Sequence, residues 1–347
     1  DDVVPFYGVS SRAIVKTLQR AVHELGVPHP LHVHCNNLGM AGSAETALAT
    51  IAAAEGLPLH LAHLQFYGYG KEGERGFSSA APRLAEAVNE TESVTIDVGQ
   101  VMFGQTVTIS SDVLRQFNAR NQASPNKWVI FDGDANGGGI VPYRYRAGDF
   151  HNAVQWCVGL ELFLLMDDPQ RVFFTTDHPN GAPFTTYPEI FALLMDRDLR
   201  AQWIATLPPA AVAVTTLASI TREYSLDEIA MMTRTAPARL LGLADRGHLG
   251  AGAVADIAVY ADEADRATMF RAAALVFKDG DLVVRDGQVS HYRWGRALTV
   301  EPGHDRAIER RMRDYFDERY GLPADVMAVP AAAIGRPEPF ESVPCAS

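Results

Sequence analysis

The sequence has 347 residues, of which 47% are hydrophobic, and it carries a formal net charge of -12 at pH 7. This length and apolar content suffice for a barrel-sized core with a small second domain, and the negative charge argues against a nucleic-acid surface, which requires a basic face. No apolar run reaches the roughly 20 residues of a membrane span, no secretory signal opens the chain, and the three cysteines have no short spacing, so we expect a cytoplasmic protein without a disulfide framework.

The first predicted unit is a helix followed by a strand. Apolar residues at helical spacing over about 10–25 end at a glycine, and an apolar strand follows at 31–35. Because side chains alternate along a strand, His32 and His34 share one face. We expect His34, nearer the polar turn, to bind a metal. Asn36 and His32 are then candidates to contact substrate or support the ligands, although a core role for His32 fits equally well.

A second helix at 43–55 precedes a strand at 59–64 that carries two more histidines. His60 and His63 are three residues apart, so in a strand they face opposite sides and at most one of them enters a barrel. We expect His63 to be the metal ligand because it lies nearer the Gly-rich turn that ends the strand. His60 is interpreted as a structural residue.

The alternation of helices and strands continues with a helix at 79–89 and a strand at 93–99. Strands separated by helices of about 10 to 15 residues predict parallel βα units. We therefore expect an α/β fold of the (β/α)₈ barrel type.

The next stretch interrupts this rhythm. After a strand at 127–131, three consecutive glycines at 137–139 favour either close backbone approach to a ligand or a flexible turn, with no preference between the two. Arg144 follows. An arginine here is suited to bidentate binding of a carboxylate, but a solvated charge pair is at least as good an explanation.

An apolar helix at 150–166 leads into a strand that ends at Asp177. Five uncharged residues precede this acid, so we expect it to be partly buried, where a carboxylate is costly unless a metal or a hydrogen bond holds it. Asp177 is therefore our candidate for a metal ligand that also acts as the catalytic general base or acid. His178 points the opposite way in an extended chain and would contact substrate or support the ligands.

The last third of the chain changes character. Further helices are predicted at 188–197, 208–219 and 225–241, the last with a capping box of Ser225 and Glu228. Short β runs with Asp-Gly hairpin signals then follow. The predicted division is a barrel at 1–246, a small β-sandwich portion at 247–303, and a C-terminal helix with an extended arm at 304–347. We expect the arm to pack on another subunit, with a frayed tail as the alternative.

Three predicted strands thus deliver His34, His63 and Asp177 to their C-terminal ends, where a (β/α)₈ barrel holds its active site. Imidazole nitrogen and carboxylate oxygen are ligands that suit zinc. Cys35 lies beside His34, but it has no activating context and is more typical of a small core residue than of a nucleophile.

These residues resemble the amidohydrolase superfamily, whose fifth and sixth barrel strands each supply a metal-binding His and whose eighth supplies an Asp, matched here by His34, His63 and Asp177. Within it, the chain is similar over residues 6–296 to the family of A-type subunits found in formylmethanofuran dehydrogenases and formyltransferase/hydrolase complexes. The motifs that carry this likeness are H-x-H-x-N-N-L-G at 32–39, G-x-V-P-Y-x-Y at 139–145, N-A-V-Q-W-x-x-G-L-E-L at 152–162 and T-T-D-H-P-N-G-x-P-F-T-x-Y-P at 175–188. The segments 235–243 and 247–256 resemble that superfamily's return to a composite β-sandwich.

The resemblance implies hydrolysis of the N-formyl group of formylmethanofuran, or of a methylofuran analogue, to formate and free amine, together with the other subunits of a formyltransferase/hydrolase complex. It also implies a binuclear zinc site completed by an H-x-H motif on the first barrel strand and a carboxylated Lys on the fourth. Neither is present in this chain, which begins without a Met or a leading strand, so we expect that an N-terminal portion is missing. The alternatives are a cyclic-amide hydrolase of the dihydroorotase or hydantoinase kind and a non-catalytic scaffold protein within such a complex.

Overall fold

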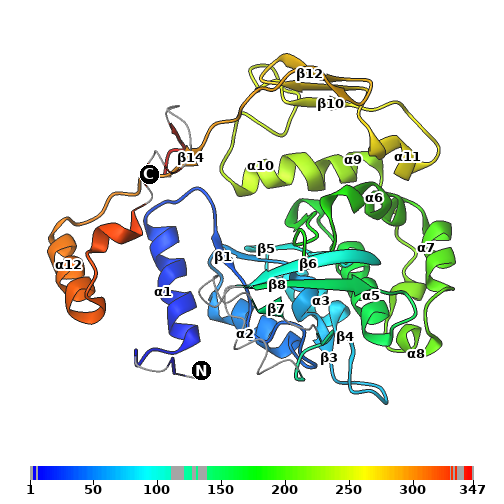
Figure 1. Cartoon of the computed structure of the whole chain (residues 1–347), viewed down its shortest axis with the longest axis horizontal. Coiled ribbons are helices and arrows are strands. Elements are labelled where there is room, and N and C mark those ends of the chain that lie inside the picture. Colours follow the sequence, from blue (N-terminus) through cyan, green and yellow to red (C-terminus); the bar gives the residue numbers. More distant parts are fainter. Residues whose placement is uncertain are drawn as a thin grey trace.

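The computed structural model describes residues 3–4, 7–110, 121–126, 130–131, 139–328, 330, 333 and 340–345. Its centre is a parallel sheet of four short strands in the order β1-β2-β5-β9 (Figure 1). These strands are Leu31–Val33 (β1), Leu59–Leu61 (β2), Val94–Asp97 (β5) and Val172–Phe173 (β9). Each crossover between neighbouring strands contains a helix, which is the TIM-barrel-like α/β arrangement that the alternating sequence pattern predicts.

The helix that precedes β1 and the helices of the three crossovers lie close to their predicted positions. They are α1 (Ser11–Glu24), α2 (Ala44–Ala53), α3 (Ala81–Glu90) and α5 (Phe150–Leu165). Within the second crossover, the short strands β3 (Tyr69–Gly70) and β4 (Ser78–Ser79) pair with each other.

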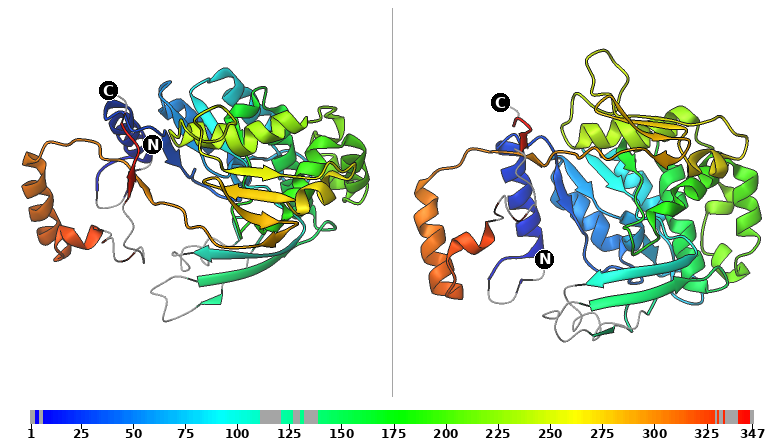
Figure 2. Two further views of the ribbon diagram at one scale, coloured as in Figure 1. Left: turned by 90° about the horizontal axis from the view of Figure 1, so that it is seen from above. Right: turned by 45° about the horizontal axis from the view of Figure 1, so that its top comes forward.

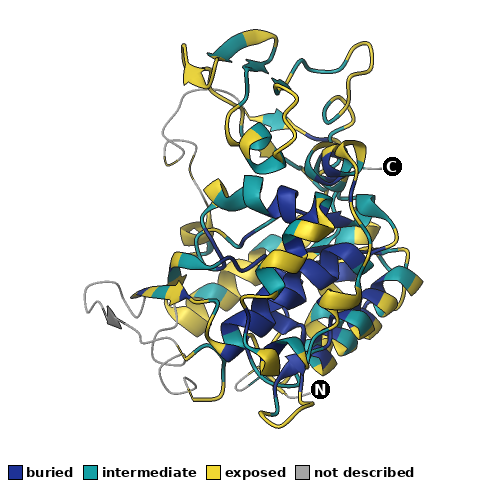
Figure 3. Cartoon of the chain, turned by 90° about the vertical axis from the view of Figure 1, so that its right-hand side faces the viewer, coloured by how far each residue is buried: buried dark blue, intermediate teal, exposed yellow. Residues whose placement is uncertain are grey.

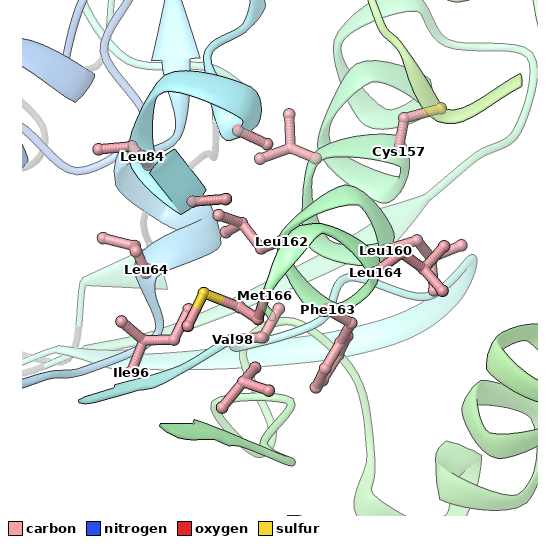
Figure 4. Packing of buried hydrophobic residues seen from close by; sticks show 14 of the residues in the cluster. Leu64, Leu84, Ile96, Val98, Cys157, Leu160, Leu162, Phe163, Leu164 and Met166 are labelled. Carbon is pink, nitrogen blue, oxygen red and sulfur yellow. The ribbon is translucent and has the colours of Figure 1, made fainter. Parts of the chain in front are cut away.

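Helix α5 is the centre of the hydrophobic core. Its sequence is apolar on all sides, as expected for a helix without a solvent-facing stripe, and every residue except His151 and Leu165 is buried. Figure 3 shows the buried helical segments gathered in the middle of the molecule. In Figure 4 the leucines of α5 and Phe163 lie near side chains of the parallel sheet and the loops that follow it, including Leu64, Ile96 and Val98. This packing fixes the sheet on which the candidate site is built.

A second sheet interrupts the third crossover. Strands β6 (Gly104–Ser110) and β8 (Gly139–Tyr145) form a long antiparallel pair, and β7 (Ile130–Phe131) adds to β8. The backbone of β6 also bonds the loop after β9, since the Val107 N–H donates to Pro179 O at 3.1 Å. The first three residues of the strand predicted at 127–131, and Gly137 and Gly138, lie outside the described residues.

The later helices follow the predicted order with two differences: helix α7 (Arg197–Ile204) was not predicted, and the helix predicted at 208–219 is shorter. They are α6 (Tyr187–Met195), α7 (Arg197–Ile204), α8 (Pro209–Val212) and α9 (Leu226–Ala230), which continues through a π-helical turn (Met231–Thr235) into α10 (Ala236–Leu240). The capping box of Ser225 and Glu228 is confirmed. The helix predicted at 208–219 is wrong in length, because the chain after α8 reaches only an isolated 3₁₀ turn, Leu217–Ser219.

The region after 247 contains one antiparallel sheet in the order β10-β11-β12-β13. Its strands are Ile257–Val259 (β10), Leu275–Lys278 (β11), Asp281–Arg285 (β12) and Gln288–Val289 (β13), with helix α11 (Arg266–Arg271) between the first two. The hairpin turns at Asp279-Gly280 and Asp286-Gly287 are confirmed, and all four residues have positive φ. The composite β-sandwich and the domain boundaries stay predictions.

The C-terminal region extends away from the body of the molecule. Helix α12 (Ala307–Tyr320) contains no buried residue and lies beyond α1 in Figures 1 and 2. The C-terminal end of α12 contacts the N-terminal segment through a 3.1 Å hydrogen bond between the hydroxyls of Tyr320 and Tyr7. Strands β14 (Leu298–Thr299) and β15 (Glu341–Ser342) pair in parallel.

Among the helices that the structure describes, none has the length and apolar character needed to cross a membrane.

Candidate metal-binding site

Two predicted metal ligands meet just beyond the ends of β1 and β2. His34 follows β1 and His63 follows β2, and their facing ring nitrogens, Nδ1 of His34 and Nε2 of His63, are 2.7 Å apart. The ring of His63 is buried, with 6% of the residue exposed, whereas His34 is exposed. The pairing of β1 with β2 thus brings together two imidazoles that are 29 residues apart in sequence.

The backbone of His63 has an unusual conformation. Its φ of 34° and ψ of 54° place it in the left-handed region at the start of a 3₁₀ turn, Leu64–Tyr67. Such conformations are uncommon for residues with a side chain and concentrate at functional sites. The His63 N–H donates to Asp97 Oδ1 at 2.8 Å, and Gly99 lies so close that a Cβ there would be 2.4 Å from His63 Cβ.

Asp177 lies on the loop that follows β9. It is partly buried, as predicted, and has a φ of 48°. The side-chain amide of Asn180 donates to its Oδ2 at 2.7 Å, and Asn180 in turn accepts a 2.5 Å hydrogen bond from the Thr108 hydroxyl. Its carboxylate is close enough to His63 to act on that ring electrostatically, although no hydrogen bond joins them among the described residues.

The protonation state of His63 favours metal binding. Burial lowers the pKa of His63, and the charges of Asp177 and Asp97 oppose this effect without cancelling it. The ring is therefore neutral near pH 7, which is the form that binds metals. Its Nδ1 is buried and has no hydrogen-bond partner among the described residues. The two converging imidazoles are ligands that suit zinc, but the ligand atoms of His34, His63 and Asp177 do not all lie within 4.8 Å of one another.

A second group of side chains lies within the strands themselves, with His32 exposed and His60 and Asp97 buried. His32 and His60 are partners in the register of β1 and β2, with ring centroids 4.9 Å apart. Together with Asp97, they offer ligand atoms within 4.8 Å of one another, so they too could hold a metal ion. The prediction that His60 and His63 face opposite sides of a strand is wrong, because β2 ends at Leu61 and His63 belongs to the turn that follows.

Asp97 is a functional candidate that the sequence pattern did not single out. It is the last residue of β5 and is 7% exposed. Burial would raise its pKa, but hydrogen bonds from His60 and Thr175 outweigh that effect and hold the pKa below its usual value. The available signal was its place at the end of an apolar strand, the same signal that identified Asp177.

Two of the remaining predicted residues lie near the strand ends. Asn36 is exposed and, with His34 and Cys35, lines a cavity of about 250 Å³ between α1 and α2. His178 is also exposed, and its Nδ1 accepts a 3.2 Å hydrogen bond from the Phe184 N–H.

Arg144 and Cys35 are the last two residues that the sequence analysis considered for the site. Arg144 is exposed on β8, and no hydrogen bond or ion pair within the described ranges joins it to the histidine pair or to Asp177. Cys35 is buried in the core, as expected, and burial raises the pKa of its thiol to about 11.

The chain is similar to known proteins over most of its length. A model of the amidohydrolase family matches residues 1–291. The FhcA subunit of the formyltransferase/hydrolase complex Fhc from Methylorubrum extorquens is 51% identical over 353 aligned residues, which cover 99% of this chain and 64% of that protein. Protein FwdA from Methanocaldococcus jannaschii is 39% identical over 321 residues, which cover 87% of this chain and 56% of that protein.

A solved structure agrees with these matches. The crystal structure of the FhcABCD complex from Methylorubrum extorquens with methylofuran contains a chain that matches with a TM-score of 0.90 and 51% identity, covering 100% of this chain and 64% of that chain. The present chain thus spans less than two thirds of the length of these relatives.

Proposed function

Because the chain belongs to the amidohydrolase family, we propose that it takes part in the metal-dependent hydrolysis of an N-formylated furan carrier, formylmethanofuran or its methylofuran analogue, to formate and free amine. The observation that carries this proposal is the 2.7 Å approach of His34 Nδ1 and His63 Nε2 at the ends of adjacent parallel strands. The name of the Methylorubrum extorquens complex and the methylofuran bound in its crystal structure supply the substrate class.

We assign the metal site to His34, His63 and Asp177. When bound there, zinc supplies a Lewis acid that polarises a carbonyl and favours ionisation of a nearby water. The neutral ring of His63 and the approach of its Nε2 to His34 Nδ1 support this assignment. In the binuclear form of this proposal, a second zinc ion is bound in part by residues outside this chain.

Asp177 is assigned the proton-transfer role. A formamide resists water because the nitrogen lone pair stabilises the carbonyl and because the amine is a poor leaving group. Asp177 accepts a proton from the attacking water and returns it to the departing nitrogen, a transfer that contributes roughly 10² to 10⁴ in rate. The hydrogen bond from Asn180 fixes one carboxylate oxygen and so orients the other for this task.

The finer assignments extend the same proposal. Substrate contacts are given to His32, Asn36, His178 and Arg144. The four-stranded β10–β13 sheet would be one layer of a composite β-sandwich spanning 247–303, between a barrel at 1–246 and an arm at 304–347 that packs on another subunit of a cytoplasmic complex.

The test is the variant Asp177→Asn in the assembled protein. We expect zinc content close to that of the wild type, because two imidazoles persist, together with a loss of nearly all formate release, because the amide cannot carry the proton. Zinc is measured by elemental analysis, and formate in the same samples.

Asp198→Asn, on the exposed surface of α7, is the matched control and should behave as the wild type. Formate release at the wild-type rate by Asp177→Asn would refute the proton-transfer role. Turnover of dihydroorotate but not of the formylated carrier would favour a cyclic-amide hydrolase instead.

A further inference from the structure

The carboxylate of Asp97 joins the ends of three parallel strands beside the candidate metal site. We propose that Asp97 is a positioning residue: it holds the backbone of His63 so that the imidazole meets His34, and it does not bind the metal itself. This inference rests on the proposed metal site and adds to it a residue from β5, the strand between β2 and β9.

The hydrogen bonds of Asp97 reach both neighbouring strands. Oδ1 accepts the His63 N–H at 2.8 Å and the Thr175 hydroxyl at 2.5 Å, and Oδ2 lies 3.1 Å from His60 Nε2. The Thr175 oxygen also accepts the Gly99 N–H at 2.8 Å. One ionised carboxylate therefore fixes the spacing of the loops that follow β2 and β9.

His63 depends on this carboxylate because its own conformation is unfavourable. A left-handed backbone is strained for a residue with a Cβ, and it persists only where the surroundings enforce it. Asp97 supplies the partner of the buried His63 N–H, which would otherwise be unpaired. The backbone of Gly99 closes the other side and leaves no room for a side chain. Loss of the Asp97 carboxylate therefore removes the hydrogen bond that holds the His63 backbone and leaves only its steric contact with Gly99.

The competing explanation is that His32, His60 and Asp97 bind the metal. Two features argue against it. Both oxygens of Asp97 already accept hydrogen bonds, and both ring nitrogens of His60 are engaged, Nε2 with Asp97 and Nδ1 with the Thr95 hydroxyl at 2.9 Å. In contrast, the facing nitrogens of His34 and His63 contact each other at 2.7 Å, so a metal bound between them would replace that one hydrogen bond and none of those made by Asp97.

Two substitutions at one position separate positioning from ligation. In Asp97→Asn the amide oxygen can still accept from His63 and Thr175, while the amide N–H₂ can donate to His60 once that ring adopts its other tautomer. In Asp97→Ala every one of these bonds is lost. A positioning role therefore predicts a graded effect, whereas ligation by the carboxylate predicts that both variants fail alike.

The experiment measures Zn²⁺ affinity of the assembled protein by competition with a chromophoric chelator, and the absorption spectrum of the Co²⁺ form. We expect Asp97→Ala to weaken Zn²⁺ binding by about 10- to 100-fold, the usual effect of losing a residue that orients a ligand, and to alter the Co²⁺ spectrum. Asp97→Asn should show a clearly smaller loss. Equal and large losses in both variants, or no loss in either, would overturn the inference.

A buried carboxylate away from the site controls for general destabilisation. Glu161 is fully buried on α5 and accepts hydrogen bonds from Ser79, Thr216 and Leu217 in the helical layer. Glu161→Ala should lower the melting temperature yet leave Zn²⁺ affinity unchanged, and a loss of affinity equal to that of Asp97→Ala would count against positioning.

If Asp97→Ala does not fold, Thr175→Val and Thr175→Ser carry the test. The valine removes one donor to Asp97 and should weaken Zn²⁺ binding, and the serine should restore it. Equal affinities in the two variants would refute the inference.

The location of the metal is tested separately. Zinc loss in His60→Ala with zinc retained in His63→Ala would place the metal on the cluster of His32, His60 and Asp97 and would overturn both proposals. A wild type that binds no zinc removes the proposed function itself, whereas zinc binding unaffected by Asp97→Ala and Asp97→Asn removes only the role of Asp97.

Discussion

At the scale of single residues, one step along the chain separates a candidate ligand from a core side chain. His34 is exposed at the end of β1, whereas the adjacent Cys35 is 7% exposed and contributes to the core. Burial raises the pKa of the Cys35 thiol to about 11, so roughly one molecule in 10⁴ carries the thiolate at pH 7. A nucleophile needs that thiolate.

We therefore expect Cys35→Ala to release formate at the wild-type rate, although the small cavity that it leaves should lower the melting temperature slightly. Initial rates at saturating carrier provide the measurement. Cys157→Ala, a second buried cysteine on α5, is the matched control for cavity formation. A large loss of rate in Cys35→Ala alone would show that the thiol takes part in the reaction.

Residue-level patterns predicted part of the site and missed another part for a physical reason. Position near the C-terminal end of a predicted strand was enough to propose the candidates His34, His63 and Asp177, because chain direction determines which end of a parallel strand a residue occupies. The alternation of side chains along a strand did not give the relative orientation of His60 and His63, because β2 ends at Leu61, before His63. Asp97 was missed because its partners, His63 and Thr175, lie 34 and 78 residues away and no local pattern records such contacts.

At the scale of elements, the start of α9 combines a capping box with an ion pair. Ser225 and Glu228 exchange hydrogen bonds, and Arg222 lies 3.2 Å from Glu228 Oε1. Partial burial would raise the pKa of Glu228, but the bonds from the Ser225 N–H and Arg222 outweigh it, so the pKa lies below its usual value of 4.5. A carboxyl with a depressed pKa stabilises the fold above its unfolded-state pKa, and that stabilisation is lost as the pH falls through the folded-state value.

The variant Glu228→Gln isolates this charge, because glutamine can still complete a capping box. We expect the free energy of unfolding of the wild type to exceed that of Glu228→Gln above about pH 4.5, and the difference to shrink as the pH falls below that value. Urea unfolding from pH 7 down to pH 3 measures it. Glu86→Gln, on the exposed face of α3, controls for net charge. A difference that grew on acidification would contradict the assigned direction.

Elements were predictable where their signal is local. The apolar pattern of α5 and the capping box of α9 lie within the elements themselves, and both were located within a residue or two. The stretch after α8 was predicted as helix but is not, because the N–H groups of Thr216 and Leu217 are taken by the Glu161 carboxylate instead of helical carbonyls. That competition depends on a glutamate 55 residues earlier, which a window of sequence cannot reveal.

At the scale of the whole molecule, burial decreases from the parallel sheet outwards. Fourteen positions of α5 are buried, whereas the strands β10–β13 and helix α12 contain no fully buried residue. The amidohydrolase family model ends at residue 291, before α12, yet the FhcA relative matches 99% of the chain. The segment that carries α12 therefore lies outside the family match but within the region aligned with this relative.

The difference in burial between these elements predicts which regions of the molecule unfold locally most often. Regions with few buried apolar contacts exchange their amide hydrogens through low-energy local opening, whereas core helices exchange only with global unfolding. In hydrogen exchange followed by mass spectrometry, we expect peptides of α5 to be the slowest, those of β10–β13 intermediate, and those of α12 the fastest. α1, which has one buried residue and a similar length to α12, is the internal comparison. Adding the other subunits of the proposed complex should slow exchange in α12 while leaving α5 unchanged, because only an exposed helix gains protection from a new interface. Exchange in α12 as slow as in α5 before assembly, or unaltered by it, would contradict an arm that packs on another subunit.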